Sequence, residues 1–374
     1  MKKPFFRKTL LIAIWFLFLL ALLQGAGFLF FTLTDVRIIG SYGYPAGLYV
    51  YNPSLNYLYN PGFEGFFVGA GYRDIPLRIN DHGFRDDPFE SRTPGRRRIL
   101  FLGDSVVFGS GVREEDRFTE QLQAHEALAG GGIDVLNLGV NAYNFGHYLE
   151  LARLRFMDLK PDLVVVGFTL NDIQKMEGLW PEKRFKPVKG QNRDLLRRKW
   201  YSKPDWVARV QQSLGRTYAA RFAEQLMKTM KQARMSEEDL KNYSTKWMRS
   251  AVTYWSKEQN RNRLRDELRL FKEEMSRQGI SFVFLLFPEK NDLLHPEEYS
   301  LPRESIIGLL DDLQINYCDA YDTFASMPDI GSLYLVNDSV HFTPAGHAVI
   351  RDALLACGKG GIVALLEGTG RSEN

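Results

Sequence analysis

The chain contains the segment Arg98-Ile99-Leu100-Phe101-Leu102-Gly103-Asp104-Ser105-Val106-Val107-Phe108-Gly109, in which an apolar run ends in a glycine and a polar turn. Such a run, followed by a helix-compatible segment, predicts a central parallel strand whose carboxyl end opens onto a crevice. Gly103 lets the backbone turn sharply, so Ser105 presents its hydroxyl above the edge of the sheet. An ordinary turn with a helix-capping serine has the same local pattern. Ser105 is therefore a candidate nucleophile whose role depends on the rest of the chain.

Similar apolar runs recur along the chain and alternate with helical segments. We predict further strands over residues 133–138, 163–167, 280–287 and 315–318. Because strand and helix alternate, we expect an α/β domain over residues 98–358, with a parallel sheet and right-handed crossovers.

The N-terminus combines positive charge with a long apolar run. Residues 1–8 are basic and residues 9–31 are uncharged. At about 1.5 Å per residue this run forms roughly 35 Å of helix, which exceeds the ~30 Å hydrocarbon core of a bilayer. The preceding charge predicts a cytoplasmic tail and a single-pass protein of the inner or plasma membrane whose later residues are extracytoplasmic. The alternative is a signal peptide cleaved near Gly25-Ala26-Gly27, although the apolar run continues through Phe31.

The composition excludes several classes of protein. At 374 residues and 45% hydrophobic content the chain can bury a full core, and a net charge of only +3 argues against a nucleic-acid partner. The sequence has no cluster of metal ligands and no glycine-rich phosphate loop after a strand, so we expect no metal and no cofactor. Cys318 and Cys357 form either one bridge in an oxidising compartment or, as we favour, two inert core thiols.

Three further segments flank or interrupt the α/β domain. Residues 32–97 form a leader rich in Gly, Pro, Asn and Tyr, for which turns and short strands fit best. Residues 180–279 form an insertion that we expect to be a helical cap beside the edge of the sheet at which the strands end, and residues 359–374 form a flexible tail. Residues 182–234 contain 15 Lys and Arg against 4 Asp and Glu. We expect this basic segment to meet an anionic lipid or an acidic glycan, with a solvated face as the alternative.

Polar turns follow three of the predicted strands, and a late loop carries an acid and a histidine. The positions concerned are Ser105, the turn from Gly139 to Ala142, Asn171, Asp338 and His341. A serine hydroxyl needs a histidine to accept its proton and a carboxylate to orient that histidine. The tetrahedral oxyanion needs hydrogen-bond donors, which backbone N–H groups and an Asn amide supply. These parts are those of acyl transfer.

The order of these positions resembles the SGNH, or GDSL-like, hydrolase family. The resemblance is carried by the blocks Gly103-Asp104-Ser105, Asn137 to Ala142, Gly167-x-x-x-Asn171-Asp172 and Asp338-x-x-His341. It implies a flavodoxin-like three-layer α/β/α fold, with Ser105 as nucleophile and first oxyanion donor and Asn171 as amide donor. It also implies that His341 is the general base and Asp338 its orienting carboxylate.

The second block departs from the family pattern. The expected oxyanion glycine falls at Ala142, and Gly139 lies three residues earlier. Because the donor is a backbone N–H, Ala142 can serve if its φ and ψ are not glycine-like, and Gly139 stays the alternative. His347 is the rival of His341 as base, but we expect it to be a surface residue of the closing helix.

Together these positions predict a serine-dependent ester hydrolase, an acyl or acetyl esterase, held at the extracytoplasmic membrane face by one helix. Its substrate is an ester-bearing small molecule, lipid or glycan. The main alternative is an O-acyltransferase that uses the same triad on a cell-envelope polysaccharide or peptidoglycan sugar, since membrane-anchored members of the family resemble such proteins. A lesser alternative is a non-catalytic scaffold that binds envelope glycans.

Overall fold

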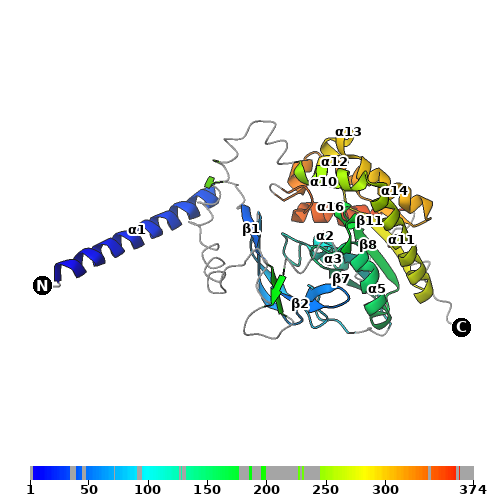
Figure 1. Ribbon diagram of the computed structural model, residues 1–374, viewed down its shortest axis with the longest axis horizontal. Coiled ribbons are helices and arrows are strands. Elements are labelled where there is room, and N and C mark those ends of the chain that lie inside the picture. Colours follow the sequence, from blue (N-terminus) through cyan, green and yellow to red (C-terminus); the bar gives the residue numbers. More distant parts are fainter. Residues whose placement is uncertain are drawn as a thin grey trace.

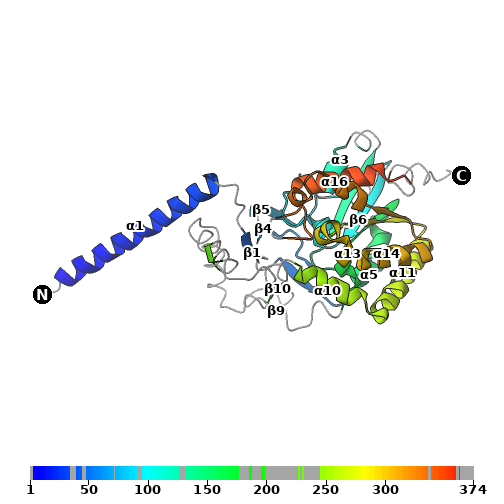
Figure 2. The same cartoon turned by 90° about the horizontal axis from the view of Figure 1, so that it is seen from above.

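The computed structural model describes residues 3–33, 39–43, 48–70, 72–90, 95–125, 128, 132–176, 185–187, 195–198, 226–227, 230, 245–335, 338–358 and 362. These residues form an N-terminal helix, two small antiparallel sheets and a larger parallel sheet flanked by helices (Figure 1). The N-terminal helix lies apart from the parallel sheet in both views (Figures 1 and 2).

The parallel sheet confirms the predicted fold class. Its strands are β6 (Arg97–Gly103), β7 (Ile133–Gly139), β8 (Leu163–Phe168), β11 (Ser281–Leu286) and β12 (Tyr317–Asp319). They pair in the order β12-β11-β8-β6-β7, and every pairing is parallel. Numbered along the chain from the β7 edge, this order is 2-1-3-4-5, the flavodoxin-like order. The order reverses between β6 and β8, so a crevice opens at the carboxyl ends of these two strands.

Helices cover both faces of the sheet (Figure 2). One face carries α5 (Phe145–Leu159), α11 (Glu258–Gln278) and α14 (Leu301–Asp312), and the other carries α3 (Phe118–Gln123) and α16 (Pro344–Ala356). Side chains alternate along each strand, so that Leu100 packs in one core and Phe101 in the other. The shorter elements of these layers are α2 (Ser105–Phe108), η1 (Leu170–Ile173), α12 (Lys290–Leu294), α13 (Pro296–Tyr299), α15 (Tyr321–Ala325) and η3 (Ile330–Leu333).

The leader packs against the α/β domain. β1 (Ile39–Gly43), β4 (Glu64–Ala70) and β5 (Tyr72–Arg78) make an antiparallel sheet. β2 (Tyr49–Asn52) and β3 (Asn56–Tyr59) form a hairpin, and its residues Tyr49, Tyr57 and Tyr59 are buried in the same core as α5. The hairpin therefore belongs to the folded domain.

The insertion differs in part from the predicted helical cap. α10 (Lys246–Trp255) and α11 are helices, but β9 (Phe185–Pro187) and β10 (Leu195–Arg198) are antiparallel strands that extend the β2–β3 hairpin. The physical reason is that the outer edge of β2 carries backbone groups that need partners, and β10 supplies them. A local helical pattern cannot show this, because strand formation follows from the tertiary neighbour. α10 lies beside η1, at the carboxyl end of β8.

Two other predicted segments lie largely outside the described residues. Of the basic segment 182–234, the structure describes mainly the backbone of β9 and β10. Of the tail 359–374 it describes Ile362 alone. The expected contact of the basic segment with an anion stays a prediction.

α1 (Lys3–Leu33) contains the predicted membrane span. Its segment from Lys8 to Leu29 has 22 residues and a mean hydropathy of 2.3, and it is almost entirely exposed. This length and composition suit a membrane span, and an N-terminal signal sequence has them too. The helix thus has the properties of both a membrane span and a signal sequence.

Cys318 and Cys357 form a disulfide that joins β12 to the end of α16. The favoured prediction of two separate thiols is therefore wrong. The two residues are 39 positions apart in sequence, and only the fold brings their Cα atoms to 5.8 Å. The loop that this bond closes contains Asp338 and His341.

Candidate active site

Ser105 is the first residue of α2 and follows closely on β6. Asp104 is the N-cap of this helix, and its Oδ1 accepts a hydrogen bond of 2.9 Å from the backbone N–H of Val106. The turn requires a glycine at Gly103, because a Cβ atom there would lie 2.1 Å from a methyl group of Val107. The local sequence thus places the hydroxyl of Ser105 at the carboxyl edge of the sheet.

Ser105, His341 and Asp338 form a continuous hydrogen-bonded chain. The Oγ atom of Ser105 lies 2.8 Å from Nε2 of His341, and Nδ1 of His341 lies 2.7 Å from Oδ2 of Asp338. The other carboxylate oxygen of Asp338 accepts hydrogen bonds of 2.8 and 3.0 Å from the backbone N–H groups of Val340 and His341. These contacts fix the imidazole so that Nδ1 donates to Asp338 and Nε2 faces the serine as a proton acceptor.

Burial and charge act in opposite directions on His341, whose side chain is 15% exposed. Burial lowers the pKa of the imidazole, whereas the carboxylate of Asp338 raises it through its charge and its hydrogen bond. The carboxyl groups of Asp104 and Glu289 add to the second effect, and the pKa of His341 lies above its ordinary value. An imidazole with a raised pKa accepts a proton more readily.

Asn171 lies in η1, beside the turn that carries Asp104 and Ser105. Its Oδ1 is 2.5 Å from the hydroxyl of Thr169, and its Nδ2 donates to Oδ2 of Asp104 at 3.2 Å. The contact with Thr169 orients the amide so that its NH₂ group faces the turn that carries Ser105. Burial raises the pKa of Asp104, and the hydrogen bonds that this carboxyl accepts oppose the shift only in part.

Gly139 is the last residue of β7, and Ala142 lies in the turn that follows it. The N–H of Gly139 donates to Oδ1 of Asn137 at 2.9 Å, so it is already used within the strand end. Glycine is required here for packing, since a Cβ atom would lie 2.2 Å from the backbone nitrogen of Phe108. Ala142 has a φ of +63°, in the left-handed region that favours glycine. The condition that the backbone is not glycine-like is therefore not met. Alanine nevertheless adopts this conformation here, at a cost of roughly 1–2 kcal/mol that neighbouring contacts must offset, so the N–H of Ala142 stays a candidate oxyanion donor.

His347 is not the surface residue that the sequence suggested. It is 1% exposed, and its Nδ1 accepts a hydrogen bond of 3.3 Å from the backbone N–H of Phe118. Burial lowers its pKa to about 3, and nearby positive charge acts in the same direction. The ring stacks on that of Phe118 at a centroid distance of 5.9 Å. His347 joins α16 to α3 and takes no part in the Ser105–His341–Asp338 chain.

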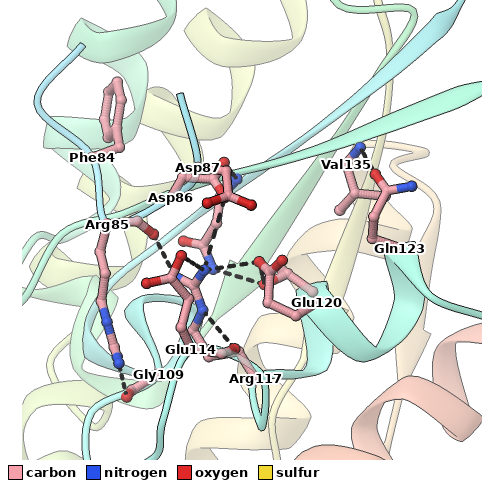
Figure 3. Close-up of polar contacts among 12 residues, drawn as sticks. Phe84, Arg85, Asp86, Asp87, Gly109, Glu114, Arg117, Glu120, Gln123 and Val135 are labelled. Atoms are coloured by element: carbon pink, nitrogen blue, oxygen red, sulfur yellow. Dashed lines mark hydrogen bonds and ion pairs between the residues drawn. The ribbon is translucent and has the colours of Figure 1, made fainter. Parts of the chain in front are cut away.

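Arg85 and Arg117 form a buried pair next to Gly109, the residue that ends α2 (Figure 3). At distances of 3.2, 2.9 and 3.0 Å, Arg85 donates to the carbonyl oxygens of Phe108, Gly109 and Val112. The guanidinium thus satisfies carbonyl groups around the C-terminal end of the short α2. Arg117 donates to the backbone carbonyl of Arg85 and to Oε1 of Glu120. Sequence analysis missed this pair, because the contacts of Arg85 with these carbonyl groups span more than 20 residues of sequence.

Glu289 is a buried carboxyl group that sequence analysis also missed. It lies just beyond β11, at the same edge of the sheet as Asp338 and His341, and is 2% exposed. The indole Nε1 of Trp247, in α10, is 3.4 Å from Oε1 of Glu289. Desolvation raises the pKa of Glu289 to about 8, although the contact with Trp247 opposes the shift. Its place directly after a buried parallel strand was the available signal, because such positions gather at one edge.

Comparison with known proteins finds no matching family model and no matching curated protein. Among solved structures, the chain is similar to TesA, with 10% identity and a TM-score of 0.41 over 73% of this chain and 99% of that one. It is similar to a member of the lipolytic protein G-D-S-L family from Veillonella parvula DSM 2008, with 11% identity and a TM-score of 0.38 over 69% and 96% of the two chains. It is also similar to the acetyl xylan esterase AlAXEase, with 13% identity and a TM-score of 0.41 over 69% and 98%.

Proposed function

We propose that the chain is a serine-dependent ester hydrolase of the SGNH, or GDSL-like, kind. The observation that carries this proposal is the hydrogen-bonded chain from Ser105 through His341 to Asp338, with contacts of 2.8 and 2.7 Å. Asn171 stands beside the same turn, bonded to Asp104. A nucleophile, a base oriented by a carboxylate and an adjacent amide donor are the parts that acyl transfer requires.

In the proposed reaction each of these groups has its own role. Oγ of Ser105 attacks the ester carbonyl carbon while Nε2 of His341 takes the hydroxyl proton, and Asp338 stabilises the imidazolium that forms. The oxyanion receives hydrogen bonds from the N–H groups of Ser105 and Ala142 and from the amide of Asn171.

The attack produces a tetrahedral intermediate that carries the oxyanion. When this intermediate breaks down, the alcohol leaves with the proton from His341, and the acyl group stays on Ser105. A water molecule then attacks the acyl group while giving a proton to His341. The carboxylic acid departs, and the proton returns to the serine oxygen. Each step forms one bond and breaks one bond at the acyl carbon.

The acceptor of the acyl group separates the proposal from its main alternative. If a sugar hydroxyl of an envelope polysaccharide or peptidoglycan replaces water, the same triad performs O-acyl transfer. Mass spectrometry of the products formed from an acyl donor, with and without a sugar acceptor, distinguishes the two reactions.

The proposed location is the extracytoplasmic face of the inner or plasma membrane, with α1 as anchor. The disulfide between Cys318 and Cys357 supports this location, because such bonds persist in oxidising compartments. Protease accessibility of the carboxyl end in spheroplasts tests it. An N-terminus near Gly27 in the purified protein would instead identify a cleaved signal peptide.

The basic segment 182–234 is proposed to bind an anionic lipid surface or an acidic glycan. Each Lys or Arg near an anionic membrane surface contributes about 1 kcal/mol at low salt. Joint replacement of Arg197, Arg198 and Lys199 by Gln should weaken liposome binding or turnover of the natural substrate. If neither changes, the segment is only a solvated surface.

Turnover of p-nitrophenyl acetate by the full-length chain tests the hydrolase itself. Ser105→Ala and His341→Ala should each abolish activity, because members of a triad act as a unit. His295→Ala is the matched control, since this histidine has an exposed side chain and lies outside the triad. Wild-type inactivity would favour the non-catalytic glycan-binding scaffold, and activity that survives His341→Ala would refute the assignment of the base.

A further inference from the structure

Two tyrosines of the leader hold the turn that contains Ala142. The hydroxyl of Tyr57 donates to the carbonyl oxygen of Asn141 at 2.7 Å. The backbone N–H of Asn141 donates to the hydroxyl of Tyr59 at 2.9 Å. Both tyrosines lie in β3, have no exposed surface, and reach the turn across more than 80 residues of sequence.

The bond from Tyr57 acts on the peptide unit that carries the proposed oxyanion donor. The carbonyl of Asn141 and the N–H of Ala142 belong to the same peptide plane, and the described part of the chain has no cis peptide bond. In a trans peptide the C=O and N–H bonds point in opposite directions. When the hydroxyl of Tyr57 fixes the carbonyl of Asn141, it therefore also fixes the direction of the N–H of Ala142.

The same contacts hold a backbone conformation that alanine disfavours. Ala142 has a φ of +63°, and an L-residue leaves this region unless its surroundings determine it. Tyr57 and Tyr59 bind the carbonyl and the N–H of Asn141, the residue just before Ala142. From the nucleophile side, the hydroxyl of Ser110 donates to Oδ1 of Asn141 at 3.1 Å. Asn141 is thus held at three atoms.

The tyrosines are themselves rigidly placed. Tyr143 donates its hydroxyl to the carbonyl of Tyr57 at 2.6 Å, so the leader and the turn are joined in both directions. The ring of Tyr49 lies 5.3 Å from the rings of both Tyr57 and Tyr59. Tyr59 also packs on Phe108 of the nucleophile helix at 5.2 Å. A side chain so confined holds its hydrogen-bond partner in one orientation.

We propose that Tyr57 and Tyr59 are positioning residues that orient the N–H of Ala142 toward the oxyanion. The inference rests on the proposed function and extends it, because it gives the β2–β3 hairpin of the leader a role in positioning an oxyanion donor. Neither tyrosine touches the substrate. Each acts through the peptide of Asn141.

The first test measures kcat and KM of full-length Tyr57→Phe and Tyr59→Phe with p-nitrophenyl acetate. Removal of one oxyanion donor lowers kcat by about 10²–10³-fold. Misorientation of the Ala142 N–H should therefore lower kcat of each variant by at least about tenfold. KM should change by less than about twofold, since the oxyanion interaction forms mainly in the transition state. Tyr334→Phe is the matched control, because it removes a buried tyrosine hydrogen bond of 2.8 Å, to the carbonyl of Pro288.

The second test is rescue by Ala142→Gly. Glycine adopts positive φ without steric cost, so it should restore much of the kcat lost in Tyr57→Phe. A residue that merely stabilised the fold would lower the melting temperature without a defect in kcat that glycine can repair. An unchanged kcat in Tyr57→Phe, or a loss that Ala142→Gly does not reduce, would overturn the proposal.

Labelling of Ser105 by a p-nitrophenyl alkylphosphonate separates this inference from the proposed function. If the wild-type chain is neither labelled nor active, the proposed function is refuted, and so is this inference. If the wild-type chain is labelled and active, and Tyr57→Phe is labelled at the same rate, only this inference is refuted. Slower labelling of Tyr57→Phe, with Tyr334→Phe at the wild-type rate, is the expected result.

Discussion

Loss of the disulfide between Cys318 and Cys357 should destabilise the chain without altering the triad. The bond joins β12 to the end of α16, across a sequence separation of 39 residues. The bond keeps the two ends of this loop together in the unfolded chain. It therefore lowers the conformational entropy of the unfolded state and stabilises the folded state relative to it. Asp338 and His341 lie within the loop, but their mutual contact of 2.7 Å does not involve either cysteine.

The size of the effect follows from the length of the loop. For a closed loop of about 40 residues, the chain-entropy relation gives roughly 13 cal/mol/K, or about 3.9 kcal/mol at 25 °C. Measured losses for native disulfides in small secreted domains are typically about 2–5 kcal/mol, so the value is an ordinary one. The free energy of unfolding should therefore fall by about 3–4 kcal/mol on reduction.

Urea unfolding followed by circular dichroism measures this difference. The comparison uses wild type without reductant (oxidised), wild type with reductant (reduced), and the double variant Cys318→Ala/Cys357→Ala measured with and without reductant. Reductant should destabilise wild type and leave the double variant unchanged, while esterase activity in the absence of urea persists in all three. A stability difference below about 1 kcal/mol between the oxidised and reduced wild type would refute the reasoning.

Three further outcomes are expected. Asn171→Ala should lower kcat by about 10²–10³ with a small effect on KM, whereas a change confined to KM would make Asn171 a substrate-binding residue. The kcat/KM of wild type should rise with pH through the pKa of His341, which lies above its ordinary value, and Asp338→Asn should shift this rise to lower pH and reduce its plateau. The pKa of Glu289 is about 8 in the folded chain against an ordinary 4.5, so folding binds a proton between these values and stability falls as pH rises through that window. Glu289→Gln should therefore be more stable than wild type at pH 8 and similar to it below pH 4.5, as urea unfolding at the two pH values would show.

The sequence predicted those features of the fold and the site that depend on a short run of neighbouring residues. Buried strands ending in polar turns predicted the parallel sheet, because this pattern is typical of open α/β folds. Asp338 precedes His341 by three residues, a spacing that lets the carboxylate reach the imidazole within one loop. Ser105 and His341, by contrast, are 236 residues apart, and only their order among the other blocks suggested that they meet.

The rest could not be predicted, because it depends on distant contacts. Alanine disfavours a positive φ, and Tyr57 and Tyr59, which we propose help to hold Ala142 there, lie in a leader whose sequence predicted only turns and short strands. β10 is a strand because β2 pairs with it. The burial of His347 depends on α3, which lies more than 200 residues away in sequence. The disulfide likewise depends on where the fold places the ends of β12 and α16.

The hydrogen bond between Tyr57 and Asn141 spans 84 residues, which has a consequence for folding during synthesis. At about 5–20 residues per second, the β2–β3 hairpin emerges roughly 4–17 s before the turn that it binds. The strand that covers its outer edge, β10, is made later still. Throughout this interval a tyrosine-rich hairpin exposes an unpaired edge, which is a known route to aggregation. Slow synthesis, or a sequence inserted between the leader and β6, lengthens the exposure and should increase the need for a chaperone.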